Sequence, residues 1–162
     1  LALLPDAQAG VNCVLLKEPG TVITGGTRTL AYQAHLKEVW DKSVELNKEI
    51  NLKNKACQPL RDKVEAEKGC NGGHCITYPP ATNSNHPKGT AFDVSKTNIK
   101  GLLDKLRPPL PLPPKLPLTE AQQHQADIKL MADWLASPAA CNLVWGGSFT
   151  NPGPDIVHFQ LP

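Results

Sequence analysis

The chain has 162 residues, a length that favours one domain. Its apolar fraction of 40% and charged fraction of 20% are ordinary for a globular protein, and its formal net charge is only +2. This weak charge, without a basic stripe or a series of base-stacking aromatic residues, argues against nucleic-acid binding. No apolar run approaches the roughly 18 to 20 residues that cross a bilayer, so we expect no membrane span.

The first third of the chain predicts short strands and then helices. Residues 11–16 and 21–24 are short apolar or β-branched runs typical of strands. Residues 30–50 predict an amphipathic helix, and residues 53–68 predict a further helix after a break near Pro59. The apolar residues that recur at helical spacing in the first of these helices are Leu36, Val39, Trp40, Val44, Leu46 and Ile50.

The middle of the chain alternates loops with short regular elements. Residues 69–85 are rich in Gly, Pro and Asn and predict a loop, whereas residues 89–94 predict a buried strand that carries Asp93. Residues 97–106 predict a short helix. The proline run of residues 108–114 lacks amide donors, so we expect a rigid surface excursion there rather than a helix or a central strand.

The last third predicts one long helix and a final strand. Thr119-Glu120-Ala121-Gln122 fits the capping-box pattern at a helix start, and Pro138 should end that helix. Residues 156–159 predict a strand after the Gly146-Gly147 break. The buried stripe of the long helix is expected to contain Ile128, Met131, Trp134 and Leu135.

This order of elements predicts the α+β class, with a small antiparallel sheet packed against two main helices. We expect a single domain over residues 1–162, with insertions at about 53–80 and 107–117.

Five cysteines are present, so at least one has no partner within the chain. Cys70 and Cys75 enclose a turn-like segment and could bridge, with Cys57 as a competitor for either. A second metal site from Cys70, His74 and Cys75 is the weaker alternative, because it lacks a fourth ligand and the paired spacing of structural zinc sites. The complete set is Cys13, Cys57, Cys70, Cys75 and Cys141.

Two histidines with nearby aspartates point to a metal. His86 lies in a loop seven residues before Asp93, and an aspartate within a buried strand is costly unless it is paired, hydrogen-bonded or bound to a metal. His158 lies in the last apolar strand, three residues after Asp155. Catalytic zinc commonly takes three protein ligands and leaves a fourth position for water. We therefore predict that His86, Asp93 and His158 bind zinc, which leaves Asp155 to accept a proton from the water.

The segments around His86, Asp93 and His158, which also contain Ser84, Gly89, Ala91 and Asp155, resemble sequences of a known family. This family comprises the zinc D-alanyl-D-alanine carboxypeptidases and L-alanyl-D-glutamate endopeptidases that cut peptidoglycan stem peptides. The resemblance implies a fold like that of the D,D-peptidases and hedgehog domains. It also implies zinc ligation by His86, Asp93 and His158 and general-base catalysis by Asp155.

The same resemblance implies roles for two further residues. Arg28, within Gly26-Thr27-Arg28-Thr29, takes the place of the arginine that polarises the substrate carbonyl, and Ser84 that of a serine that contacts substrate. The cysteine-containing segment from Cys57 to Cys75 and the proline run are departures from the family pattern.

Within that family, an aspartate as the base together with the Trp145–Phe149 segment looks more like the endopeptidases of phage endolysins and bacterial wall hydrolases. A D-alanyl-D-alanine carboxypeptidase and a non-catalytic wall-binding zinc module are the alternatives. The expected partner is a peptidoglycan stem peptide, and we expect a monomer that acts in the periplasm or cell wall. The sequence leaves open whether the chain is secreted, phage-encoded or delivered, and whether it is fused to a larger delivery or wall-binding protein.

Overall fold

The computed structural model describes residues 2–69, 76, 79–81, 83–108, 118–137, 139–150 and 153–162. The described residues form six α-helices and a four-stranded antiparallel sheet, which confirms the predicted α+β class. They divide into two compact units: Leu1–Thr27 with Lys88–Pro162, and Arg28–Pro87. The helices within these described ranges include none with the length and apolar character needed to cross a membrane.

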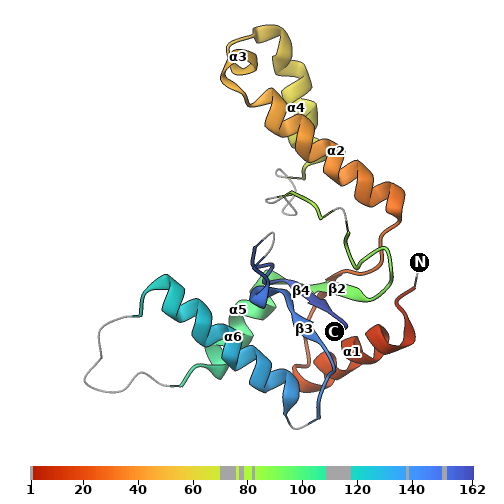
Figure 1. The fold of residues 1–162 in the computed structure, drawn as a ribbon, viewed down its shortest axis with the longest axis vertical. Helices are drawn as coiled ribbons and strands as arrows, with labels where there is room; N and C mark the ends of the chain where they lie inside the picture. Colours follow the sequence, from red (N-terminus) through yellow and green to blue (C-terminus); the bar gives the residue numbers. More distant parts are fainter. Residues whose placement is uncertain are drawn as a thin grey trace. The chain divides into compact units, whose positions relative to one another are not determined.

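The sheet belongs to the first unit and joins strands from distant parts of the chain (Figure 1). Its strand order is β1-β2-β4-β3, and each neighbouring pair is antiparallel. The predicted strand around Asp93 is confirmed, and the final strand begins two residues later than predicted. The strands are β1 (Ile23–Gly25), β2 (Ala91–Val94), β3 (Val144–Trp145) and β4 (His158–Gln160).

One face of the sheet forms the core of this unit. Phe92 on β2 lies opposite Phe159 on β4, and their rings stack with centroids 5.6 Å apart. Both side chains are fully buried within an apolar cluster shared with α1 (Pro5–Lys17), α5 (Lys96–Leu106) and α6 (Glu120–Ala136). Because side chains alternate along a strand, Asp93 and His158 project from the opposite face.

The segment predicted as a strand at residues 11–16 is instead part of helix α1. Its buried residues are Ala7, Gly10, Val11 and Val14, which recur at helical rather than strand spacing. Pro5 stands at the start of the helix, where its missing N–H has no intrahelical partner to lose. The apolar run misled the prediction because the helical periodicity becomes visible only when the preceding turn is included.

Helices α5 and α6 confirm the later predictions. The capping box of α6 is formed, with the Thr119 hydroxyl accepting from the backbone N–H of Gln122. Met131 and Leu135 are buried in the core. Arg107, directly after α5, makes a two-point ion pair with the buried Asp127 of α6 and so joins the two helices. The proline run from residue 109 onward and Pro138 lie outside the described residues.

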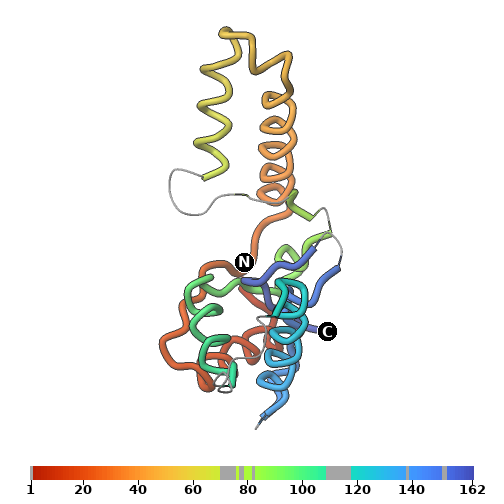
Figure 2. The backbone as a smooth tube through the Cα atoms, turned by 90° about the vertical axis from the view of Figure 1, so that its left-hand side faces the viewer, coloured from red at the N-terminus to blue at the C-terminus, as the bar shows by residue number. Residues whose placement is uncertain are grey.

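The second unit contains α2 (Leu30–Leu46), α3 (Glu49–Leu52), a 3-10 turn (Lys55–Cys57) and α4 (Gln58–Glu67). Helices α2 and α4 run side by side (Figure 2).

The amphipathic helix predicted here exists, but its buried face differs from the prediction. Val39, Ser43 and Leu46 are buried, whereas Val44 and Ile50 are exposed. Ser43 donates a hydrogen bond of 2.7 Å to Glu65 of α4, so a polar contact replaces part of the expected apolar stripe. The helix predicted after a break near Pro59 is α4, which follows the 3-10 turn and carries Pro59 in its first turn.

Three helices, α1, α5 and α6, therefore share the apolar cluster with the sheet, in place of the two main helices that were predicted. The difference has two causes: α1 was assigned to a strand, and the long helix α2 belongs to the second unit and contributes no described residue to the cluster. The predicted boundaries of one domain with two insertions stay a prediction.

Candidate metal centre

The register of the sheet brings Asp93 and His158 together. They are direct partners across the antiparallel strands β2 and β4, and opposed residues in such a pair project from the same face. Nδ1 of His158 lies 3.3 Å from Oδ1 of Asp93. Both residues are buried, with exposed fractions of 7% and 8%. Two residues 65 positions apart in the chain therefore share one polar site on the sheet.

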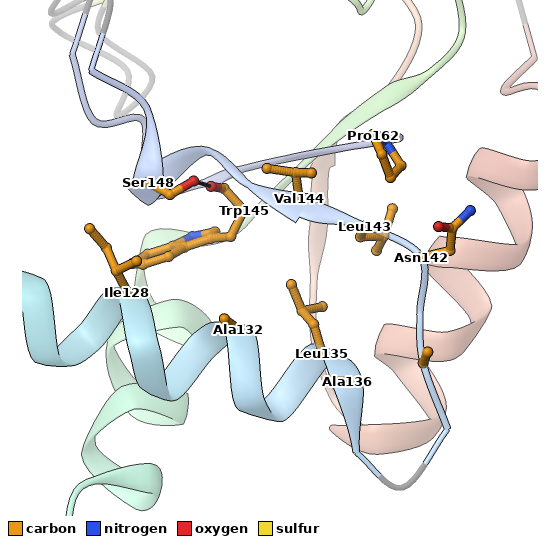
Figure 3. Close-up of a pocket in the computed structure, with 11 residues that line it drawn as sticks. Ile128, Ala132, Leu135, Ala136, Asn142, Leu143, Val144, Trp145, Ser148 and Pro162 are labelled. Carbon is orange, nitrogen blue, oxygen red and sulfur yellow. Dashed lines mark hydrogen bonds between the residues drawn. The ribbon is translucent and has the colours of Figure 1, made fainter.

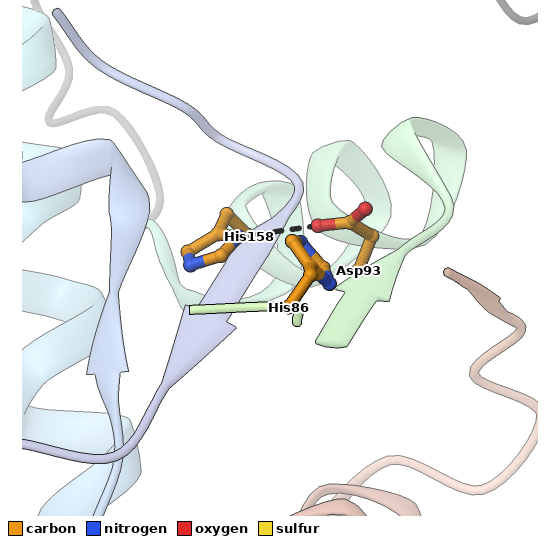
Figure 4. Close-up of side chains that lie close together, drawn as sticks. All are labelled: His86, Asp93 and His158. Atoms are coloured by element: carbon orange, nitrogen blue, oxygen red, sulfur yellow. Dashed lines mark hydrogen bonds and ion pairs between the residues drawn. The ribbon is translucent and has the colours of Figure 1, made fainter. Parts of the chain in front are cut away.

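His86 completes a cluster of three possible metal ligands (Figure 4). One ligand atom from each of His86, Asp93 and His158 lies within 4.8 Å of the others. His86 is also buried, with 3% of its surface exposed. The three residues predicted as ligands from the sequence thus lie close enough to hold one metal ion.

The donor set and its spacing fit a small divalent cation. Ligand atoms that lie about 2.0–2.1 Å from a tetrahedral zinc ion are about 3.3 Å apart. The His158 and Asp93 atoms already have this separation. Two imidazoles and one carboxylate also match the ligand types of catalytic zinc sites, which leave one position for water.

Gly25 provides the space that the Asp93 carboxylate occupies. It is the β1 partner of Asp93, and a Cβ atom built on Gly25 would lie 2.6 Å from Asp93 Oδ2. Any side chain here would have to displace the carboxylate. The sequence signal was present, because a glycine in a strand often marks the close approach of another group.

The surroundings of His158 raise its pKa. Burial acts to lower the pKa by disfavouring the charged ring, but the hydrogen bond and negative charge of Asp93 outweigh it, with further help from Gln160 and Asp155. In the metal-free protein the imidazolium form of His158 is therefore more stable, relative to the neutral ring, than in an unperturbed histidine. A metal ion that binds this ring must displace a proton.

The loop before β2 holds His86 through local contacts. The Ser84 hydroxyl accepts a hydrogen bond of 3.3 Å from the backbone N–H of His86. Gly89 has a φ of 73°, which favours glycine, and its carbonyl accepts a hydrogen bond of 2.9 Å from the N–H of Leu4. Ser84 thus has a role within the loop, and its predicted contact with substrate stays a prediction.

Asp155 lies in the turn that precedes β4. Its backbone N–H donates to the carbonyl of Gly146 at 2.9 Å, and its own carbonyl accepts from the N–H of His158 at 3.1 Å. The indole N–H of Trp145 donates to the carbonyl of Ile156 at 2.7 Å and fixes the same turn. Asp155 is exposed and its charge contributes to the raised pKa of His158. The predicted base is therefore near His158, a candidate ligand, and accessible to solvent.

Arg28 follows β1 and precedes Thr29, the residue that caps the start of α2. It is half-buried. Its predicted contact with the substrate carbonyl stays a prediction.

A residue that the sequence reasoning missed is Gln160. Its Oε1 atom lies 3.1 Å from Nε2 of His158. The predicted final strand ended one residue before Gln160. Extending it by that residue would have placed Gln160 on the same face as His158, because residues two apart on a strand share a face.

The structure contains a disulfide that was not predicted from the sequence. Cys13 of α1 forms a disulfide with Cys141, which comes shortly before β3. Cys57 is free among the described cysteines. The bridge predicted for Cys70 and Cys75, and the alternative metal site with His74, lie outside the described residues. The Cys13–Cys141 disulfide is compatible with an oxidising compartment.

A separate apolar pocket lies between α6 and the segment that contains β3 (Figure 3). Its walls include Ala132, Leu135 and Val144, and none of the six predicted site residues lines the part that the structure describes. The pocket and the metal centre are therefore distinct features.

Comparison of the chain with protein-family models, with curated proteins and with solved structures gives no match.

Proposed function

We propose that this protein is a zinc-dependent peptidase that hydrolyses peptidoglycan stem peptides, with the L-alanyl-D-glutamate bond as its target. The observation that carries the proposal is the buried cluster of His86, Asp93 and His158 on the polar face of the sheet. The motif resemblance supplies the substrate class.

The ligand count supports a catalytic rather than a structural ion. Structural zinc sites are closed by four protein ligands, whereas catalytic sites keep a position open. Three ligands gather here, and no fourth His, Cys, Asp or Glu joins their group among the described residues. Bound zinc would supply Lewis acidity and make water a better nucleophile near neutral pH.

The chain's own residues would then handle protons and charge. Asp155 is exposed in the turn beside the proposed ligand His158. A general base must reach both the water and the substrate, so it needs an exposed position of this kind. It accepts a proton from the attacking water and returns one to the leaving amine. Arg28 stabilises the negative charge that develops on the carbonyl oxygen. Losing one such stabiliser typically costs about 3 kcal/mol, or about a hundredfold in rate.

The test is cleavage of purified muropeptides by the zinc-loaded protein, with mass spectrometry of the new termini. A free amine on D-glutamate is the expected product, and a parallel reaction with EDTA should give none. Released D-alanine would instead identify a D,D-carboxypeptidase. Zinc binding without cleavage of any stem peptide would contradict the proposed activity and favour the wall-binding module.

A further inference from the structure

Gln160 and His158 occupy the same face of β4. They are two residues apart on the strand, so both side chains project from the polar face, while Phe159 between them projects into the core. The cross-strand partner of Gln160 on β2 is Ala91. The small side chain of Ala91 leaves room for the side chain of Gln160 to extend along the sheet. The arrangement brings Oε1 of Gln160 to 3.1 Å from Nε2 of His158.

The two ring nitrogens of His158 therefore face different oxygen atoms. Nδ1 lies 3.3 Å from the Asp93 carboxylate, and Nε2 lies 3.1 Å from the Gln160 carboxamide. Asp93 is itself a member of the ligand cluster, whereas the carboxamide of Gln160 is not among the usual protein ligands of zinc. An ion shared by His158 and Asp93 must approach the ring from the side of Nδ1.

An imidazole that binds a metal carries its remaining proton on the other nitrogen, and an acceptor for that proton fixes the tautomer and orientation of the ring. Oε1 of Gln160 stands where such an acceptor is needed. A carboxamide accepts this hydrogen bond without adding a second negative charge beside the ion, so the positive charge of the centre is less neutralised than with a carboxylate acceptor.

We propose that His158 binds the metal through Nδ1 and that Gln160 is a positioning residue, which accepts the Nε2–H hydrogen bond and holds the ring in that tautomer. This inference rests on the metal binding in the proposed function, but it is independent of the reaction that the metal serves.

The test has two measurements. Competition with a chromophoric chelator gives the zinc affinity, and long-range ¹H–¹⁵N NMR of the zinc-loaded protein gives the tautomer of His158. Gln160→Leu keeps most of the side-chain volume and removes the acceptor. We expect its zinc affinity to fall by about 10- to 100-fold, the usual effect of losing such a partner. Gln160→Glu restores an acceptor and should bind zinc at least as tightly as the unmodified protein.

The matched control is Gln8→Leu, because Gln8 is an exposed glutamine on α1 that bonds to Asn12. Its zinc affinity should not change. The NMR spectrum of the unmodified protein provides a reading that does not depend on any variant folding: Nε2 should carry the proton and Nδ1 should not.

Two results would overturn the positioning role while leaving zinc binding intact: unchanged affinity in Gln160→Leu, or a proton on Nδ1 of His158 in the loaded protein. Failure of the unmodified protein to bind zinc would overturn both this inference and the proposed function. Failure to cut stem peptides would affect only the proposed function.

Discussion

Gly25 and Asp93 are paired across β1 and β2 so closely that a Cβ atom on Gly25 would lie 2.6 Å from the carboxylate oxygen Oδ2. The absence of a side chain at Gly25 thus leaves the space that the carboxylate of Asp93, a candidate metal ligand, occupies. We expect Gly25→Ala to displace the Asp93 carboxylate and to weaken zinc binding about tenfold or more, as losses of ligand support commonly do. Zinc titration of the purified variant measures this.

The control is the next residue. A Cβ atom on Gly26 would meet nothing within 4 Å, so Gly26→Ala should bind zinc like the unmodified protein. Equal affinities for the two variants would refute the steric role of Gly25.

The second prediction concerns the proposed base. Asp155→Asn keeps the volume of the side chain and removes its ability to accept a proton, so hydrolysis should fall by about 10² to 10⁴-fold. Zinc content should stay at one ion per chain, because Asp155 is not a member of the ligand cluster. Asp133→Asn is the matched control, since Asp133 is an exposed aspartate on α6 that pairs with Lys129. Normal turnover by the Asp155 variant would remove this residue from the mechanism.

The third prediction follows from the raised pKa of His158. In the metal-free protein the folded state holds a proton more tightly than the unfolded chain, whose histidine pKa is about 6.5. The stability that this proton contributes is fully present below that value and is lost as the pH rises through the higher folded-state pKa. Zinc requires the ring without that proton, so stabilisation by zinc should grow over the same rise in pH.

Thermal unfolding at a series of pH values, once with EDTA and once with excess zinc, measures both trends. The pH-dependent difference between the two series should disappear in His158→Asn and persist in His35→Asn, because His35 is an exposed residue of α2 that pairs with Glu67. A zinc effect that is independent of pH would contradict the predicted competition with protons.

The fourth prediction concerns the disulfide between Cys13 and Cys141, which are 128 residues apart. It joins α1 to the segment before β3 and constrains the unfolded chain over most of its length. Replacing both cysteines by alanine should lower the free energy of unfolding by about 2–5 kcal/mol. Cys57→Ala, at the free cysteine of the described set, is the control and should cost much less. Denaturant unfolding compares the two variants.

Local sequence patterns predicted a large part of the fold. The capping box at Thr119 placed the start of α6, and the apolar flanks of Asp93 placed β2, because both signals arise from neighbouring residues. The same approach failed for α1, whose buried residues extend one turn before the apolar run that suggested a strand. A local pattern predicts the right type of element when the stretch of sequence considered covers the whole element.

The candidate metal centre was likewise predicted only in part. The ligand types His86, Asp93 and His158 were predicted from their surroundings and from the resemblance, and the structure brings all three together. Gly25 was missed because its importance depends on its pairing with Asp93 across two strands that are far apart in the sequence. Gln160 was missed because the predicted final strand ended one residue before it. The Cys13–Cys141 pair was missed for a similar reason, since its partners meet only in the folded chain.

The most direct test of the central claim is the zinc content of the purified protein after dialysis against a small excess of zinc, measured by mass spectrometry of the metal. One ion should bind per chain, and His158→Ala should lose it, with Gly26→Ala as the folded control. A chain that retains no zinc, or a His158→Ala variant that keeps a full ion, would contradict the metal centre proposed for this protein.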